Sequence, residues 1–172
     1  YKEKMMCLDA KPNAAHNKLS ELEKSGKLKA VVTQNIDGLH QKAGNKTVYE
    51  LHGSIHRNYC MKCKKFYDAK YVKNQKGIPY CECGGMIKPD VVLYEEGLDG
   101  NVINAAIRAI ASADTLIIGG TSLVVYPAAS FIDYFHGKHL VVINKLETGK
   151  AVNAELSINA TIGEIMSGIK IK

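Results

Sequence analysis

The sequence lacks tryptophan altogether, and only 7% of its 172 residues are aromatic. It also lacks any apolar run near the ~18 residues of a membrane-spanning helix, because the longest run, 123–132, is broken by Pro127 and Ser130. No signal-peptide pattern opens the chain, and no internal repeat or low-complexity tract interrupts it. These absences argue against a membrane-spanning or repeat protein, and we expect a cytoplasmic location by default.

Charge of one sign is not strongly in excess. There are 23 Lys and Arg against 17 Asp and Glu, a net charge of +6, and the acidic residues are scattered. The densest basic stretch, at 62–65, is interpreted as a solvated face, with a phosphate or nucleic-acid contact as the alternative. We therefore expect neither a nucleic acid nor a membrane as partner.

Short apolar runs alternate with helical periods along most of the chain. We expect helices at 13–25, 101–112 and 127–135, and strands at 28–33, 47–51, 91–94, 115–118 and 140–143. Such alternation predicts an α/β fold with a Rossmann-like parallel sheet covered by helices on both faces.

Residues 57–88 have a different composition, rich in Lys, Gly, Tyr and Cys and poor in Ile, Val and Leu. A segment so short of apolar residues cannot build a core of its own and needs another source of stability. We predict a small zinc-ribbon-like module at 57–88, inserted into a larger domain formed by 1–56 and 89–172.

Four cysteines of this segment have the spacing of a metal site. Cys60 and Cys63 form a Cys-x-x-Cys pair, and seventeen residues later Cys81 and Cys83 form a tighter Cys-x-Cys pair. Two such turns can present four sulfurs to one tetrahedral Zn²⁺, which leaves no open position for catalysis. Structural zinc is the favoured interpretation, and disulfides or free thiols are the alternative. Cys7 has no partner nearby and is expected to be a buried small residue.

Polar residues follow three of the expected strands. They are the run Thr33-Gln34-Asn35-Ile36-Asp37, the run Gly119-Gly120-Thr121-Ser122, and Asn144. Ligands of doubly wound sheets lie at the carboxyl ends of strands, so three such loops favour a dinucleotide along this edge. For the first run, a helix cap and turn built from the same residues is an equal alternative.

His52 and Gly53 stand at the end of another expected strand. Histidine exchanges a proton near neutral pH and is the usual general base, and glycine permits a close approach of backbone. Taken alone, however, an isolated histidine is more often structural than catalytic.

Together these motifs closely resemble the sirtuins, which are NAD-dependent protein-lysine deacylases. The resemblance covers nearly the whole chain in the right order. The residues that carry it are the runs 33–37 (TQNID), 50–53 (ELHG), 88–92 (KPDVV) and 120–129 (GTSLVVYPAA), the two cysteine pairs, and the pair Ile143-Asn144.

The resemblance implies a role for each matching residue. His52 would be the general base, in a reaction in which the acyl-lysine oxygen attacks the nicotinamide ribose. The products would be deacylated lysine, nicotinamide and O-acyl-ADP-ribose. The residues that would contact NAD are Gln34, Asn35, Ile36, Asp37, Gly120, Thr121, Ser122, Asn144, Lys145 and, on a loose alignment, Thr161.

The same resemblance implies an acylated-lysine protein or peptide as substrate. Val92 and Tyr94 would wall the tunnel for the acyl-lysine side chain. The peptide would add as an extra strand between the loop after Val92 and the segment that carries Leu123, Val124 and Val125.

The chain departs from the family pattern at two places. Tyr94-Glu95-Glu96 stands where many sirtuins have Phe-Gly-Glu, and the added charge of Glu95 predicts a preference for basic residues beside the target lysine. The family's first strand and Gly-Ala-Gly-x-Ser loop match nothing here, and the chain opens with Tyr1 and not Met. We therefore expect the natural protein to begin upstream, and this chain by itself to bind NAD poorly and to turn over little.

Two alternative functions stay open on the sequence. One is mono-ADP-ribosyl transfer to protein on the same fold, because the same activated sugar can meet another nucleophile. The other is a catalytically incompetent NAD- or peptide-binding module that contains zinc.

Overall fold

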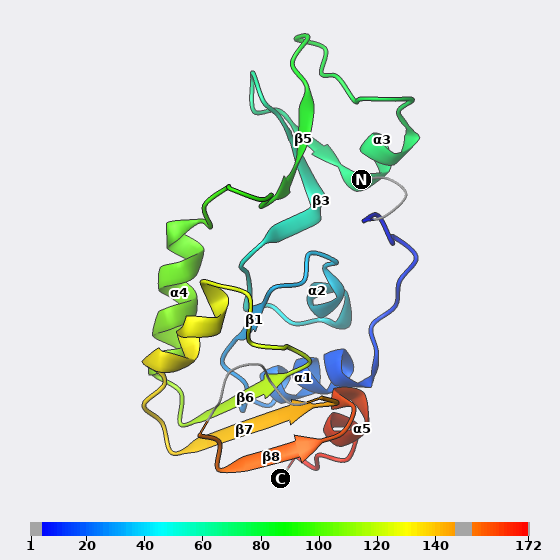
Figure 1. Cartoon of the computed structure of the whole chain (residues 1–172). Coiled ribbons are helices and arrows are strands. Elements are labelled where there is room, and N and C mark those ends of the chain that lie inside the picture. The colour runs from blue at the N-terminus through cyan, green and yellow to red at the C-terminus, as the bar shows by residue number, and fades with distance from the viewer. Residues whose placement is uncertain (1–4, 147–152, 172) are drawn as a thin grey trace.

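The structure, a computed structural model, describes residues 5–146 and 153–171 (Figure 1). The elements in chain order are α1 (Ala14–Lys24), β1 (Val31–Thr33), α2 (Leu39–Ala43), β2 (Val48–Glu50), β3 (Gly53–Cys60), β4 (Phe66–Asp68), α3 (Ala69–Asn74), β5 (Ile87–Val91), α4 (Gly100–Ala111), β6 (Thr115–Gly119), the 3₁₀ helix η1 (Ala128–Tyr134), β7 (His139–Asn144), β8 (Leu156–Asn159) and α5 (Ile162–Ser167). In the part of the chain so described, no helix combines the length and the apolarity that a membrane crossing requires.

The described strands form three sheets. β1 pairs with β2, and β6, β7 and β8 form a second sheet, both of them parallel. The third sheet has the order β4-β3-β5 and is antiparallel. The α/β class with parallel strands is as predicted. The single parallel sheet that we expected is instead present as two separate parallel sheets, because no described strand joins β1 to β6.

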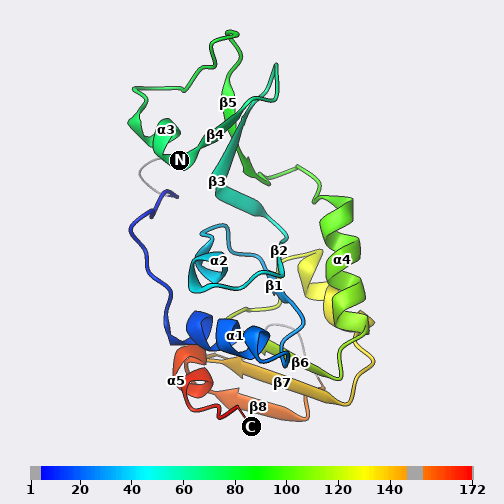
Figure 2. The ribbon, with the colours of Figure 1, turned by 180° about the vertical axis from the view of Figure 1, so that it is seen from behind.

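Helices α1 and α5 lie side by side against the β6-β7-β8 sheet (Figures 1 and 2). Ala15 of α1, Ile143 of β7 and Met166 of α5 form the buried centre of this contact. Asn13 begins α1 as its N-cap, since its side chain accepts a hydrogen bond from the amide of His16. The N-terminal ends of both helices therefore lie at the carboxyl end of β7, near polar residues that the sequence predicted to bind a dinucleotide.

A second core lies between α4, η1 and the β1-β2 pair. The apolar stripe of α4, with Ala106 and Ile110 buried, packs against Phe131 of η1 and against Leu51. Leu51 is only 3% exposed, so the residue that precedes His52 is anchored in this core.

The upper part of the molecule in Figure 1 is the small module with the sheet β4-β3-β5 and helix α3. Its core joins Cys60, Tyr67, Val72 and Ile87 to Met6 from the N-terminal segment. The sheet extends beyond 57–88, since β3 begins at Gly53 and β5 ends at Val91. The module is thus continuous with the segment that carries His52.

Two expected elements differ in the structure. The strand expected at 91–94 is β5, which ends at Val91 and passes through Pro89. Proline interrupts a central strand but is tolerated at an edge, and β5 is an edge strand of its sheet. The helix expected at 127–135 is present as the 3₁₀ helix η1.

Candidate active site and metal centre

His52 lies in the tight connection between β2 and β3. Its Nδ1 is 3.0 Å from the carbonyl oxygen of Gln34. A carbonyl oxygen can only accept, so Nδ1 carries the hydrogen and Nε2 keeps a free lone pair. The backbone of His52 is held as well, because its carbonyl accepts a hydrogen bond of 3.1 Å from the amide of Val92. Nε2 is therefore the atom of this ring that can take a proton.

Gly53 allows the backbone after His52 to approach β5 closely. It has φ +73°, and a Cβ built there would overlap the carbonyl oxygen of Asp90. Its register partner on β5 is Val91. Only glycine fits this position, and the close approach sets Val92 next to His52.

The loop that follows β1 is held against β3 by two hydrogen bonds. The amide of Ile55 donates to the carbonyl of Ile36 at 3.0 Å, and Nε2 of His56 lies 2.9 Å from the carbonyl of Asp37. The carboxylate of Asp37 accepts from the amide of Leu39 at 3.0 Å, at the start of α2. Asp37 thus forms a local turn before α2, whose N-cap is Gly38, while its role toward a ligand stays a prediction. The positioning role of His56 was not foreseen, and no signal in the sequence marks it.

Arg57 joins three strands around His52. Its Nη1 donates to the carboxylate of Glu50 at 2.7 Å, and its Nε donates to that of Asp90 at 2.7 Å. The side chain of Glu50 is only 8% exposed, against 43% for Asp90. The guanidinium therefore ties β2, which leads into His52, to β5, which leads into Val92. Sequence reasoning placed Arg57 only at the edge of the insert.

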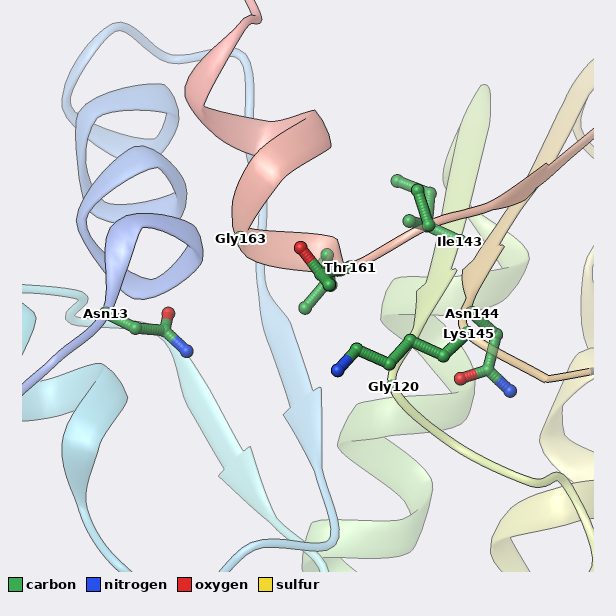
Figure 3. A pocket seen from close by; sticks show the side chains of 9 residues that line it. Asn13, Gly120, Ile143, Asn144, Lys145, Thr161 and Gly163 are labelled. Carbon is green, nitrogen blue, oxygen red and sulfur yellow. The ribbon is translucent and has the colours of Figure 1, made fainter.

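A pocket of about 340 Å³ opens at the carboxyl ends of β6 and β7 (Figure 3). Among its lining residues are four predicted NAD contacts, Gly120, Asn144, Lys145 and Thr161. The structure thus brings together residues that lie up to 41 positions apart in the chain. Asn13 also lines the pocket and was not predicted, because its sequence pattern marks only a helix start.

The edges of this pocket are fixed by local hydrogen bonds. The side-chain amide of Asn144 donates to the carbonyl of Thr121 at 3.0 Å, and the amide of Gly120 donates to the carbonyl of Ile143 at 3.2 Å. Thr161 caps α5 through its hydroxyl oxygen. The remaining predicted contacts, Gln34, Asn35, Ile36, Asp37, Thr121 and Ser122, are not among the lining residues. The first four lie instead with His52.

The predicted substrate residues are mostly exposed. Tyr94 is fully exposed, and Val124 and Val125 are about half exposed. Leu123 has φ +54°, a conformation that a leucine rarely adopts. Val92 is the member of this set that the structure places directly against His52, through the backbone bond described above.

The four cysteine sulfurs converge in the small module. All four lie within 4.8 Å of one another, with 3.4 Å between the Sγ atoms of Cys60 and Cys83 and 3.6 Å between those of Cys63 and Cys81. A disulfide requires about 2.05 Å, so these pairs are not bonded. A tetrahedral Zn²⁺ with Zn–S bonds of about 2.3 Å separates its sulfurs by about 3.8 Å. The group therefore fits one structural zinc ion with no open position.

Neighbouring hydrogen-bond donors lower the pKa of Cys60 and Cys81 and so favour their thiolate form. The hydroxyl of Tyr67 donates to Sγ of Cys81 at 3.0 Å and lowers the pKa of that thiol to about 6. The amide of Cys63 donates to Sγ of Cys60 at 3.4 Å. The expectation that Cys7 is buried is wrong, because it is exposed in the N-terminal segment, which packs through Met6 instead.

Comparison with known proteins shows to which family this chain belongs. Residues 1–127 match the profile of the Sir2 family. The NAD-dependent protein deacetylase of Clostridium acetobutylicum is 60% identical over 171 residues, which is 98% of this chain and 70% of that protein. That of Clostridium perfringens is also 60% identical, with the same coverage. The fold is that of a sirtuin, and the chain belongs to the Sir2 family.

Solved structures agree with this placement. A Sir2 complex with a p53 peptide and NAD+ superposes with a TM-score of 0.86 at 40% identity, over 92% of this chain and 69% of that one. A Sir2 structure with an acetylated peptide gives a TM-score of 0.85 at 40% identity, with the same coverage. The predicted sirtuin fold is thereby confirmed.

Proposed function

We propose that this protein removes acetyl and related acyl groups from lysine side chains of proteins, with consumption of NAD. The products are deacylated lysine, nicotinamide and O-acyl-ADP-ribose. Support comes from 60% identity to NAD-dependent protein deacetylases along 98% of the chain. In the structure, the observation that carries the proposal is the hydrogen bond between Nδ1 of His52 and the carbonyl of Gln34, which leaves Nε2 free.

His52 acts as general base in this proposal. When bound, NAD supplies a ribose carbon that becomes reactive as nicotinamide leaves. Nε2 of His52 takes a proton from a ribose hydroxyl, because its Nδ1 is already committed to a carbonyl. Val92, whose amide is bonded to the backbone carbonyl of His52, receives the acyl-lysine peptide together with Tyr94, Leu123, Val124 and Val125.

Two groups of residues hold NAD at the two ends. The loop with Gln34, Asn35, Ile36 and Asp37 is on the side of His52 and faces the nicotinamide ribose. The pocket with Gly120, Asn144, Lys145 and Thr161 suits the adenosine end, since about 340 Å³ is within the range of small-ligand sites. Thr121 and Ser122 extend this second group toward the phosphates.

We further propose a cytoplasmic location and a structural role for zinc. Four thiols that are not joined in disulfides can bind Zn²⁺ only where they stay reduced, as in the cytoplasm. The metal braces the module from which β3 and β5 lead to His52 and Val92. It takes no part in the proton transfer, because four sulfurs fill its coordination sphere.

The proposal is tested by chromatographic measurement of nicotinamide release by the full-length natural protein, with and without an acetylated peptide. We expect release only with the peptide, one deacetylated peptide per nicotinamide, and O-acetyl-ADP-ribose by mass spectrometry. His52→Ala should lower turnover by about 10²–10⁴-fold, the usual contribution of a general base. His136→Ala, at an exposed histidine between η1 and β7, is the matched control and should leave turnover unchanged.

Other products would contradict the proposal. A peptide that gains the mass of ADP-ribose would indicate mono-ADP-ribosyl transfer. Peptide binding with no nicotinamide release would indicate a binding module without catalysis. Normal turnover by His52→Ala would remove His52 from the role of general base.

A further inference from the structure

Asn13 directs a hydrogen-bond donor into the adenosine pocket. Its Oδ1 accepts from the amide of His16 at 3.1 Å and lies 2.7 Å from Nδ1 of the same residue. These contacts fix which end of the side-chain amide is the oxygen, so Nδ2 is turned the other way. Figure 3 shows that nitrogen pointing into the pocket.

Lys145 approaches the same space from the opposite side. It directly follows β7, and its side chain extends across the pocket toward Asn13 and Thr161 (Figure 3). It forms no ion pair with any residue that the structure describes. One ammonium and one amide donor therefore converge from two separate elements.

None of the nine residues that line this pocket carries a carboxylate. In Rossmann-type sites an acidic residue after the second strand binds the ribose 2′-hydroxyl and selects NAD, whereas a basic residue accommodates a 2′-phosphate. Here β7 ends on Asn144 and is followed by Lys145. The pocket thus offers positive charge and donors where an NAD-selective site places negative charge.

We propose that this pocket accepts a phosphate on the adenosine ribose, so that NADP competes with NAD for the enzyme. The inference rests on the proposed function, which places adenosine in this pocket. Nζ of Lys145 and Nδ2 of Asn13 donate to the phosphate. NADP then inhibits the deacylation reaction, and the inhibition increases with the concentration of NADP in the cell.

The test uses isothermal titration of the protein with two pairs of probes. One pair is NAD and NADP, and the other is 5′-AMP and adenosine 2′,5′-bisphosphate, each pair differing only by the 2′-phosphate. We expect the bisphosphate to bind about tenfold more tightly than 5′-AMP, and this advantage to shrink as salt is raised. NADP should compete with NAD in the nicotinamide-release assay.

Two variants locate the effect. Lys145→Glu reverses the charge, and Asn13→Asp replaces Nδ2 by an oxygen while keeping a good N-cap for α1. Each should lower the ratio of bisphosphate to 5′-AMP affinity by about tenfold. Lys73→Glu on α3 makes the same change in net charge in the small module and should leave the ratio within about threefold.

The outcomes separate this inference from the proposed function. Equal binding of the two AMP probes, or an unchanged ratio in Lys145→Glu and Asn13→Asp, overturns the phosphate site even where NAD-dependent deacetylation is normal. Absence of nicotinamide release refutes the proposed function, and the AMP pair still decides whether the pocket prefers a phosphorylated ribose. A ratio that falls as much in Lys73→Glu as in Lys145→Glu overturns the assignment, because net charge alone then explains it.

Discussion

The amide of Val92 donates to the carbonyl of His52 at 3.1 Å, so the expected wall of the acyl-lysine tunnel is bonded to the backbone of the expected general base. Gly53 makes this possible, because any Cβ there would overlap the carbonyl of Asp90. The two residues are 40 positions apart in the chain. Their relative position is set by the pairing of β3 with β5, which belong to the small module.

Arg57→Met should destabilise the region around His52. The buried carboxylate of Glu50 loses its partner, and leaving such a group unsatisfied costs about 1–3 kcal/mol of unfolding free energy. Denaturant unfolding measures the stability, and kcat/KM for an acetylated peptide should fall with it, since β2 and β5 are no longer joined. Lys65→Met is the control, because its pair with Glu82 is exposed and screened by solvent, so its loss should cost little stability. Equal losses in the two variants would contradict the role given to Arg57.

Removal of the metal should unfold the small module. Cys60 is fully buried, and Cys60→Ser takes one ligand from a site that can supply ~10–16 kcal/mol of apparent folding free energy in small zinc domains. Metal analysis should find one zinc per chain, and a strong chelator should lower the melting temperature. Cys7→Ser, at an exposed cysteine outside the cluster, should change neither quantity. Full zinc content in Cys60→Ser would refute the four-sulfur site.

Acidification should destabilise the contact between α1 and α2. The rings of His16 and His40 have centroids 4.6 Å apart and planes tilted by 50°, and Nδ1 of His40 is buried without a described partner. Burial lowers the pKa of His16, against the effect of Asp37, which raises it. Burial and then the nearby His16 lower the pKa of His40, and Asp37 again opposes them.

The sign of this pH effect follows from the direction of both shifts. The unfolded chain binds protons before the folded one as pH falls below the ordinary value of 6.5. The stability is therefore complete above 6.5 and is lost as pH falls through the lowered pKa values. We expect a smaller free energy of unfolding at pH 5.5 than at pH 7.5, and a weaker pH dependence in His40→Gln. His136→Gln, at an exposed histidine, should retain the full dependence, and an equal slope in all three proteins would contradict the prediction.

Glu95 should favour basic residues beside the target lysine. It has φ +70°, the left-handed conformation that a glycine adopts more readily, and its side chain is exposed. The next residue, Glu96, is held by Lys88 at 3.0 Å, so Glu95 carries the charge available to a peptide. We expect kcat/KM for peptides with Lys or Arg flanks to exceed that for Glu flanks by up to about fivefold at low salt, and less at high salt.

Glu95→Gln should remove most of this preference. Glu21→Gln, at an exposed carboxylate on α1 that pairs with Lys18, is the matched control and should retain it. Equal efficiency for both peptide classes in the unmodified protein would discard the prediction.

Features that depend only on residues close together in the chain could be predicted from the sequence. The spacing of Cys60, Cys63, Cys81 and Cys83 determined a four-sulfur group, because each pair forms its own turn. The period of α4 and the apolar run of β7 likewise determined these two elements. The division of the parallel strands into two sheets was not readable, because pairing between strands depends on contacts that no local pattern specifies.

The sequence by itself thus determined the family, the four-cysteine group and the histidine that we propose as general base. Only the tertiary structure decided that Arg57 joins Glu50 to Asp90, and that Asn13 faces Lys145 across one pocket. Asn13 and Lys145 are 132 positions apart, and each has an ordinary local role, as a helix cap and as a polar residue after a strand. The packing of α1 and α5 on β7 brings these two residues to one pocket. This packing depends on complementary shape between apolar faces that are distant in the chain, so no short segment of the sequence predicts it.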